Sequence, residues 1–403
     1  MGTVEKLEQV GFSASKRQLE LIDVARQLAR DVLAKNADRY DREGSNPVDD
    51  YAALRAAGFY GMLIPEEYGG MGLDMVTYCL LAHELGQGSA ATATAFNMHN
   101  FAMLTIDLTG TDEQKGHWFG KVIQDGNLIG GWGSEPTAGL AGGHFNVSTT
   151  LTPHEDGYLI NGLKFFCTLA GVASYATLLS VAPDKVGNVT VNDIVSVVVP
   201  VDNPGVTVSD DWDVVGMRAT VSPGVKFENV FVPKENVLAE PGINIFTQDF
   251  LQAIHVGYAA IYSGLARAAV DFSIDYSVRK VVGPNGARHG QQPIIQLRIG
   301  ELATAVDAAF AHALRAAWEI DQDYAMAARN SVGSKARAMA MRTVVDVTSA
   351  AFDVCGGTTV ASRYPLGRFF RDARTQTLMA PGYDTICQLI GSNLVAAAIA
   401  DEG

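Results

Sequence analysis

Residues that could bind an anionic ligand gather in one segment of the chain, 355–374. Gly356 and Gly357 come first, and a glycine pair lets a ligand or another chain approach the backbone closely because no Cβ intervenes. Four charged side chains are grouped near the end of the segment: Arg368, Arg371, Asp372 and Arg374. Since the planar guanidinium suits phosphate and carboxylate, the segment predicts an anion site. For the adjacent pair Arg371 and Asp372, an ion-paired structural cluster is the better explanation.

Three further segments are candidate ligand contacts by residue type, and each also has a plain structural explanation. Ser134 lies in a glycine- and proline-rich stretch, 131–139, which is equally typical of an ordinary turn. Residues 164–168 read Lys-Phe-Phe-Cys-Thr, a pattern that any amphipathic strand can share. Arg279 stands near the end of a long helical pattern, where a cation also stabilises the helix dipole.

Composition restricts the class of protein. The chain has 403 residues, 48% of them hydrophobic, which is enough for a large core and two or three domains. Only 18% are charged, which hints at buried subunit interfaces. The formal net charge of −14 disfavours nucleic acid and anionic membranes as partners, and no apolar run approaches the ~18 residues of a membrane helix. Four scattered cysteines without CxxC spacing and a polar first segment predict a cytoplasmic protein with reduced thiols and no metal site.

The spacing of apolar residues changes twice and predicts an α+β protein of three domains. Residues 1–125 show the helical period and predict an N-terminal all-α domain. Residues 126–242 alternate with a period of two and predict a central β-barrel-like domain, with a hairpin turning at Asn161-Gly162. Residues 243–403 return to the helical period, and their long alanine-rich helices, one of them at 325–355, predict a C-terminal four-helix bundle.

This order of domains and these motifs resemble the acyl-CoA dehydrogenase family, the FAD enzymes that remove two hydrogens next to an acyl thioester. Residues 131–139 are similar to the family's Thr-Glu-Pro-x-x-Gly-Ser-Asp loop, 164–168 to its Lys-x-Trp-Ile-Thr strand and 279–283 to its Arg-x-x-Phe-Gly helix end. The resemblance covers nearly the whole chain. It implies FAD as the cofactor, with FMN the less expected choice, and a homotetramer. The cofactor contacts that it implies are Ser134, Phe166, Thr168, Arg279, Val282, Gly356 and Gly357.

On the flavin ring, the resemblance gives these residues separate roles. Ser134 would donate to the pyrimidine oxygens, Phe166 would pack on the ring, and Thr168 would hydrogen-bond near N5. Reduction builds negative charge and a proton at that edge of the ring, which is why a hydrogen-bond donor is expected there.

At the other end of the cofactor, Arg279 would bind the pyrophosphate, and Val282 replaces the family's phenylalanine on the adenine side. The pair Gly356-Gly357 would reach the FAD of a neighbouring subunit. Asp353 stands where the family has glutamine, so a nearby cation is expected, with the arginines at 363–374 as candidates.

Two family positions for the catalytic base carry no carboxylate in this chain. Taking the α-proton of an acyl thioester requires such a base. The position after the Arg-Asp-Ala-Arg motif is Ala380, and the alternative position in the first bundle helix is Ile254. The remaining candidates for the base are Asp384 and His255. The residues expected to line the substrate pocket are His99, Tyr258 and Ala380, although His99 is also explained as a core histidine and Asp384 as a helix cap.

Three functions are compatible with these features. The first is oxidation of an acyl substrate, with acyl-CoA the expected carrier, at Cα–Cβ with hydride transfer to flavin N5. The second is a flavin-dependent monooxygenase on the same fold, which the loss of both base positions favours. The third is a catalytically silent flavin- or acyl-binding subunit of a heteromeric complex. Flavin content, acyl-CoA reactivity and oxygen reactivity of the purified protein distinguish them.

Overall fold

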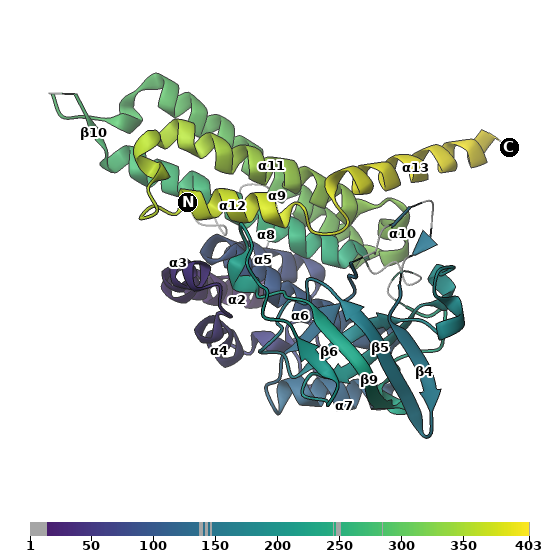
Figure 1. Ribbon diagram of the computed structural model, residues 1–403. Helices are drawn as coiled ribbons and strands as arrows, with labels where there is room; N and C mark the ends of the chain where they lie inside the picture. Colours follow the sequence, from purple (N-terminus) through teal and green to yellow (C-terminus); the bar gives the residue numbers. More distant parts are fainter. Residues whose placement is uncertain are drawn as a thin grey trace.

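The structure is a computed structural model that describes residues 14–136, 140–141, 144–145, 147–244, 246, 251–283 and 285–402. Helices make up 61% of it, and the strands lie in the central part of the chain, which confirms the predicted mixed class. Figure 1 shows the C-terminal helices lying across the N-terminal helices and the sheets. One large apolar core joins the N-terminal helices to the C-terminal ones, and a second core lies within the sheets.

The N-terminal part is helical, as its apolar spacing predicts. Its helices are α2 (Lys16–Leu28), the π-helical turn η1 (Ala29–Leu33), α3 (Ala34–Glu43), α4 (Val48–Ala56), α5 (Met75–Gly88), α6 (Ala90–Thr109) and α7 (Asp112–Ile123), with short 3₁₀ turns η2 (Phe59–Gly61) and η3 (Glu66–Tyr68). Side-chain caps satisfy the first free amides of several helices. In α5, for example, the Asp74 carboxylate accepts from the Thr77 amide at 2.7 Å.

The central part contains two main sheets. The three-stranded sheet has the order β1 (Ile129–Trp132), β6 (Tyr175–Ser180), β7 (Val195–Pro200), and the four-stranded sheet has the order β4 (Thr150–His154), β5 (Gly157–Lys164), β9 (Val225–Pro233), β8 (Val206–Val208). Only the β1–β6 pair is parallel among these. A two-stranded hairpin, β2 (Leu140–Ala141) with β3 (His144–Phe145), and the 3₁₀ turns η4 (Pro183–Lys185), η5 (Val191–Asp193), η6 (Arg218–Thr220) and η7 (Lys234–Asn236) complete the region.

The hairpin predicted at Asn161-Gly162 is wrong. Strand β5 runs straight through both residues, and the chain turns earlier, between His154 and Gly157. At Gly162 the pairing with β9 shifts register, and a Cβ there would lie 2.6 Å from Thr149 Oγ1. The glycine is therefore needed for a bulge and a close approach, which give the same sequence signal as a turn.

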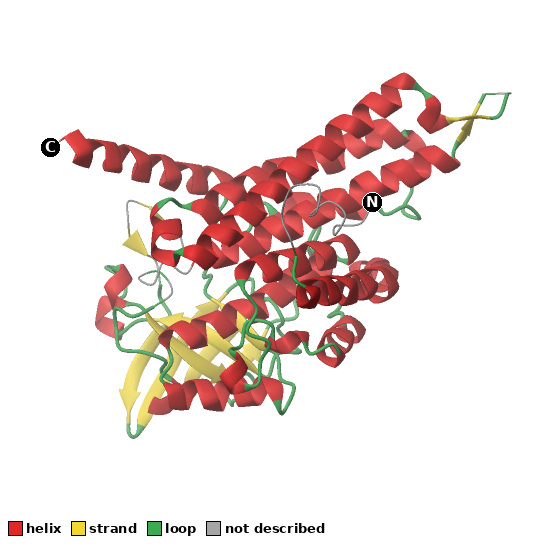
Figure 2. Ribbon diagram, turned by 180° about the vertical axis from the view of Figure 1, so that it is seen from behind, coloured by secondary structure: helices red, strands yellow, loops and turns green. Residues whose placement is uncertain are grey.

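The C-terminal part consists of long helices. They are α8 (Leu251–Arg279), α9 (Pro293–Gln322), α10 (Tyr324–Arg329), α11 (Val332–Cys355), α12 (Leu366–Gln376) and α13 (Tyr383–Glu402), with the 3₁₀ turns η8 (His289–Gln291) and η9 (Gly357–Val360) and the small hairpin β10 (Val281–Val282) with β11 (Ala287–Arg288). Helices α8, α9 and α11 run lengthwise beside one another, and α13 extends away from them in both views (Figures 1 and 2). The helix predicted over 325–355 is split, because Ser331 adopts a left-handed backbone (φ 53°) between α10 and α11.

Close approaches of α8 to its neighbours depend on absent side chains. A Cβ on Gly264 would lie 2.3 Å from the carbonyl oxygen of His83 in α5, and one on Gly333 of α11 would lie 2.2 Å from that of Gln252 in α8. The second contact matters for the site, because it brings the start of α11 against the start of α8. Among the described residues, none of the helices is both long and apolar enough to span a bilayer.

Candidate active site

Two of the predicted flavin contacts lie where strand β5 ends. The amide of Phe165 donates to the carbonyl oxygen of Ser134 at 2.9 Å, which holds the Ser134 loop against the strand end. Phe166 has a left-handed backbone (φ 53°) and its side chain remains 59% exposed. A bulky residue held in this strained conformation with an exposed ring is unusual for a structural role, and it offers a flat apolar surface for a planar ligand.

A buried ion pair fixes this loop from behind, and sequence reasoning missed it. Lys164 Nζ lies 2.6 Å from Glu135 Oε1, and both side chains are fully buried. Glu135 also accepts from the hydroxyls and amides of Ser148 and Thr149. Burial alone would raise the pKa of Glu135, but Lys164 and these hydrogen bonds lower it overall. The sequence contains one signal for this ion pair, because Glu135 directly follows Ser134 in the loop motif.

Thr168 is buried, and its hydroxyl belongs to a chain of hydroxyl groups. Thr220 Oγ1 donates to the Met217 carbonyl at 3.0 Å, and Ser222 Oγ donates to Thr220 Oγ1 at 2.9 Å. Because both protons are then used, the 2.9 Å contact between Thr168 and Ser222 makes Thr168 the donor. In this arrangement Thr168 has used its proton and presents only lone pairs to a ligand. It therefore does not fit the predicted role of donor and suits instead a partner that donates, such as the N5–H of a reduced flavin.

The other predicted cofactor contacts form a second group at the ends of α8 and α11. Arg279 is 78% exposed and pairs with Asp275 at 2.6 Å. Lys280 Nζ donates to the Cys355 carbonyl at 3.1 Å, which places the end of α8 beside the Gly356-Gly357 turn, and Val282 follows in β10. Figures 1 and 2 both show that this end, marked by the β10 hairpin, is the end of the long helices that lies farthest from the sheets. One chain therefore does not bring the two groups together.

Asp353 does have a cation beside it, but not one of those predicted. Its carboxylate lies 3.5 Å from Arg298 Nη1 of α9. Sequence reasoning considered only the arginines at 363–374, because they are near in the chain, whereas the actual partner comes from a separate helix of the bundle.

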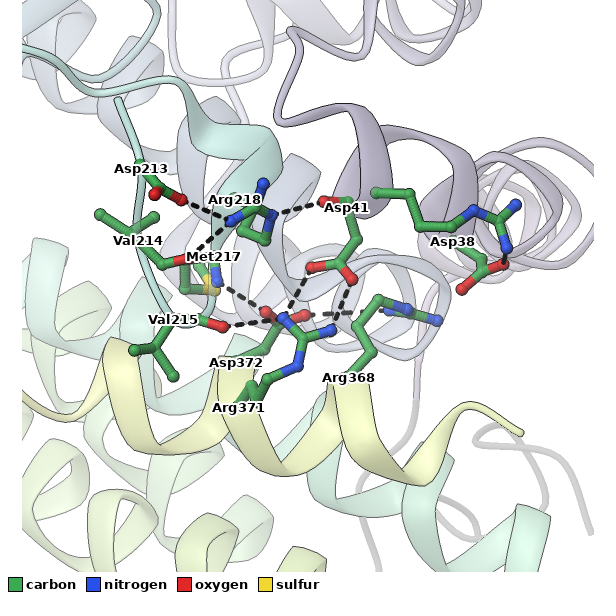
Figure 3. Close-up of polar contacts among 11 residues, drawn as sticks. Asp38, Asp41, Asp213, Val214, Val215, Met217, Arg218, Arg368, Arg371 and Asp372 are labelled. Atoms are coloured by element: carbon green, nitrogen blue, oxygen red, sulfur yellow. Dashed lines mark hydrogen bonds and ion pairs between the residues drawn. The ribbon is translucent and has the colours of Figure 1, made fainter. Parts of the chain in front are cut away.

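Arg368 and Arg371 of the 363–374 segment make structural contacts, and the structural interpretation of Arg371 and Asp372 agrees with these contacts. Figure 3 shows Arg371 and Arg218 both reaching Asp41 of α3, Arg371 through the carboxylate and Arg218 through the carbonyl oxygen. Asp372 accepts from the Met217 amide at 2.6 Å and lies 3.9 Å from Arg368. We call this set the arginine clamp: Asp41, Met217, Arg218, Arg368, Arg371 and Asp372. It joins all three parts of the chain.

The region around the missing base contains a buried cation instead of a carboxylate. Ala380 is exposed in the turn before α13, and Ile254 is buried in α8. Arg337 of α11 is fully buried; its Nη2 donates to the Met379 carbonyl at 2.9 Å, directly before Ala380. Its guanidinium carbon lies 4.6 Å from the ring centroid of Tyr258, one turn beyond Ile254. Sequence reasoning missed Arg337.

Of the two candidate bases, His255 lies in this region and Asp384 lies at its edge. His255 is buried, and its Nδ1 lies 3.0 Å from Ser334 Oγ, which in turn contacts Gln252 Oε1. If Ser334 donates to that amide oxygen, His255 Nδ1 carries the proton and Nε2 presents a lone pair. Burial and the charge of Arg337 lower the pKa of His255 well below its usual range. Asp384 is exposed in the first turn of α13.

His99 has a structural position. Its Nδ1 accepts from the Ile129 amide at 3.1 Å, so Nε2 carries the proton and donates to the Tyr60 carbonyl at 3.0 Å. Burial lowers the pKa of His99 to about 4, although both hydrogen bonds oppose the change. Both ring nitrogens are therefore occupied by backbone groups, which join α6 to the start of β1. Neither ring nitrogen of His99 is therefore free to contact a substrate, and its predicted role in the substrate pocket has no support from this geometry.

Comparisons with known proteins agree with this architecture. Family models match three stretches: acyl-CoA dehydrogenase N-terminal domain at 15–125, middle domain at 131–230 and C-terminal domain at 256–380. A dibenzothiophene monooxygenase from Rhodococcus qingshengii is 28% identical over 382 residues, 89% of each chain. The probable acyl-CoA dehydrogenase YngJ of Bacillus subtilis is 28% identical over 91% of this chain and 94% of its own length.

Among solved structures, FMN-bound TdsC from Paenibacillus sp. A11-2 superimposes with a TM-score of 0.84 at 26% identity, covering 94% of this chain and 98% of its own. Thus both the dehydrogenase and the monooxygenase branches are represented among the relatives. With its three parts matched in order by the family models, the chain belongs to the acyl-CoA dehydrogenase family of flavin oxidoreductases.

Proposed function

We propose that this protein is a flavin-dependent monooxygenase. An organic substrate would gain one oxygen atom from dioxygen, the other oxygen leaving as water, and the two electrons required would come from reduced flavin supplied by a separate reductase. The observation that carries the proposal is the composition of the region around Met379 and Ile254. Where the family's dehydrogenases need a carboxylate, this chain has Ala380, Ile254 and the buried cation Arg337.

The two candidate bases do not replace that carboxylate well. A general base works best when its pKa lies near the working pH, and burial lowers the pKa of His255 far below that. Asp384 is exposed at the start of α13, where it faces solvent rather than the buried region. Removal of an α-proton from an acyl thioester therefore has no evident acceptor among the described residues.

The residues at the end of β5 support flavin as the cofactor. Phe166 offers an exposed ring, Ser134 a hydroxyl beside the strand, and Thr168 a polar group in an otherwise buried position. When bound, the flavin would supply the redox chemistry; the protein would stack against it, orient it and exclude water. The dibenzothiophene monooxygenases among the relatives support the proposed monooxygenase function.

The separation of the two groups of cofactor contacts supports a homo-oligomer, and we propose the homotetramer typical of the family. Each flavin would contact Ser134, Phe166 and Thr168 of one copy and the α8 and α11 tips of another. FAD would use both groups, whereas FMN would use mainly the first. Chromatography of the cofactor released from the purified protein distinguishes them.

Dehydrogenation of an acyl-CoA is the second candidate. It is favoured by one observation: the imidazole of His255, beside Ile254, has no hydrogen-bond partner on Nε2 among the described residues. That lone pair could accept a proton, although burial and the charge of Arg337 lower the pKa of His255 and make the imidazole a weak base.

Anaerobic titration of the flavin-loaded oligomer with short-, medium- and long-chain acyl-CoA tests the proposal. The flavin absorbance should stay unchanged, because no residue takes the α-proton. Bleaching by any of these thioesters would contradict the monooxygenase proposal and establish the dehydrogenase. A matched His255→Gln variant, tested in parallel, shows whether any bleaching depends on that imidazole.

A further inference from the structure

The most unusual charged group outside the assigned cofactor contacts is Arg337. It is fully buried, yet none of the ion pairs found among the described residues includes it. One of its nitrogens donates to the Met379 carbonyl, whereas Nε and Nη1 have no hydrogen-bond partner in the described structure. At least three of its five N–H donors, one on Nε and two on Nη1, therefore have no partner there.

Such an arrangement is costly without a ligand. Buried charges in folded proteins are paired or hydrogen-bonded, because taking an ion out of water costs several kcal/mol. Arginine stays charged in proteins, so Arg337 cannot escape this cost by losing its proton. The ring of Tyr258, 4.6 Å away, compensates in part through a cation–π contact. It leaves the N–H groups themselves unsatisfied.

The surroundings of Arg337 contain further unused polar atoms. We define the Arg337 junction as His255, Tyr258, Tyr262, Ser334 and Arg337; the first three lie on one face of α8 at helical spacing. His255 Nε2 has no partner among the described residues. Tyr262 donates to the backbone of Gln376 at 2.9 Å, and the buried side-chain amide of Gln376 is also unpartnered there.

Gly333 explains why these groups meet at all. Its missing side chain lets α11 approach α8, and Ser334 then contacts both His255 and Gln252. Three helical segments thus bring unused hydrogen-bonding atoms to one buried place. A solely structural arginine would be expected to have its donors used, as those of Arg371 are.

We propose that Arg337 binds an anionic group of the substrate, so that the enzyme acts on an organic acid carrying a carboxylate or sulfonate-type oxyanion. The proposal depends on the proposed function only in treating this region, next to both base positions, as the place of the substrate. Arg337 would neutralise the oxyanion and donate to it from Nε and Nη1. The Gln376 amide nitrogen would donate to the remainder of the polar group. Uncharged thioesters or aromatic sulfides would gain nothing from this cation.

Calorimetric titration of the flavin-loaded oligomer tests this without turnover. The probes are acetate, benzoate and methanesulfonate, compared with the neutral acetamide and benzamide, in Tris buffer at constant ionic strength. At least one anion should bind ten-fold or more tightly than its neutral counterpart. Arg337→Met should abolish that preference, Arg337→Lys should retain part of it, and Arg315→Met should leave it unchanged, because Arg315 pairs with Glu319 on the surface.

Equal binding of anions and amides by the wild-type protein, or binding of neither, would overturn the proposal, whether or not the Arg337→Met variant folds. A folded Arg337→Met variant that keeps the preference would overturn it as well. Because no oxygen or acyl-CoA is present, failure here is distinguishable from failure of the proposed monooxygenase.

Discussion

The arginine clamp and the Arg337 junction use the same side chain in opposite ways. In the clamp, Arg371 donates to Asp41 and to the Val215 carbonyl, and Asp372 accepts from the Met217 amide (Figure 3). In the junction, Arg337 is more deeply buried, but its Nε and Nη1 have no hydrogen-bond partner among the described residues. Paired charges at a meeting of three parts of the chain specify how those parts fit together. An unpaired charge beside the expected reaction site is explained better by a ligand than by folding.

The largest effect on stability is expected from Asp372→Ala. This change leaves Arg368 without its buried partner and the Met217 amide without an acceptor, which should cost about 3–5 kcal/mol. Denaturant unfolding at pH 7 measures it, since burial raises the pKa of Asp372 to about 6 and the carboxylate is ionised above that value. The matched control is Asp213→Ala, which removes a 94% exposed partner of Arg218 and should cost less than about 0.5 kcal/mol. Equal losses in the two variants would contradict the structural role of the clamp.

His99 should give a pH-dependent effect of similar or smaller size. Its pKa is about 4 in the folded protein and 6.5 in the unfolded chain, so the unfolded state binds more protons below pH 6.5. Its contribution is therefore complete above pH 6.5 and is lost as the pH falls toward 4, by about 3 kcal/mol. The difference in unfolding free energy between wild type and His99→Gln should narrow over that range. A difference that is constant with pH would show that His99 is not buried as a neutral imidazole.

Thr168→Val should have a moderate effect at the flavin side. The change removes the hydrogen bond to Ser222 and the lone pairs offered to the ligand, with about 1–2 kcal/mol lost for one hydrogen bond. The rate of flavin reduction or the affinity for reduced flavin should fall accordingly, measured by rapid-mixing absorbance. Ser209→Ala, whose hydroxyl lies outside this network, serves as the control. Unchanged flavin kinetics would refute the role assigned to Thr168.

Phe166→Gly should separate stability from binding. Glycine adopts the left-handed conformation without strain, so the flavin-free protein should be equally stable or more stable by about 1 kcal/mol. Flavin affinity should fall, because the exposed ring is lost; fluorescence titration measures it. A variant that is destabilised but binds flavin normally would show that the ring serves packing instead.

Only a small effect on stability is expected from Arg337→Met, and this variant tests the comparison between the two arginine sites most sharply. Replacing a buried, unpaired cation by an apolar side chain of similar length should change the unfolding free energy by about 1 kcal/mol or less, or increase it. A loss comparable to that of Asp372→Ala would mean that Arg337 already has a structural counter-ion.

Local patterns allowed the three-part order to be predicted, because helical and alternating spacing are short-range signals. The Ser134 loop and residues 164–168 were proposed as cofactor contacts from short motifs that resemble those of the family. Contacts between distant segments were not predictable: Asp41 lies 330 residues before Arg371, and Arg298 comes from another helix than Asp353. Arg337 was missed because an arginine in an alanine-rich helix that also carries Lys335 and Arg342 is expected to be solvent-exposed. Its flanking residues, Ala336 and Ala338, are in fact buried as well.

The reaction of the reduced, flavin-loaded protein with dioxygen tests the central claim most directly. The protein is reduced anaerobically, mixed rapidly with oxygenated buffer, and followed by the return of flavin absorbance. The monooxygenase account predicts rapid reaction with dioxygen, because the site must admit oxygen to the reduced ring. A reduced flavin that persists in oxygenated buffer, shielded as in the dehydrogenases, would contradict it.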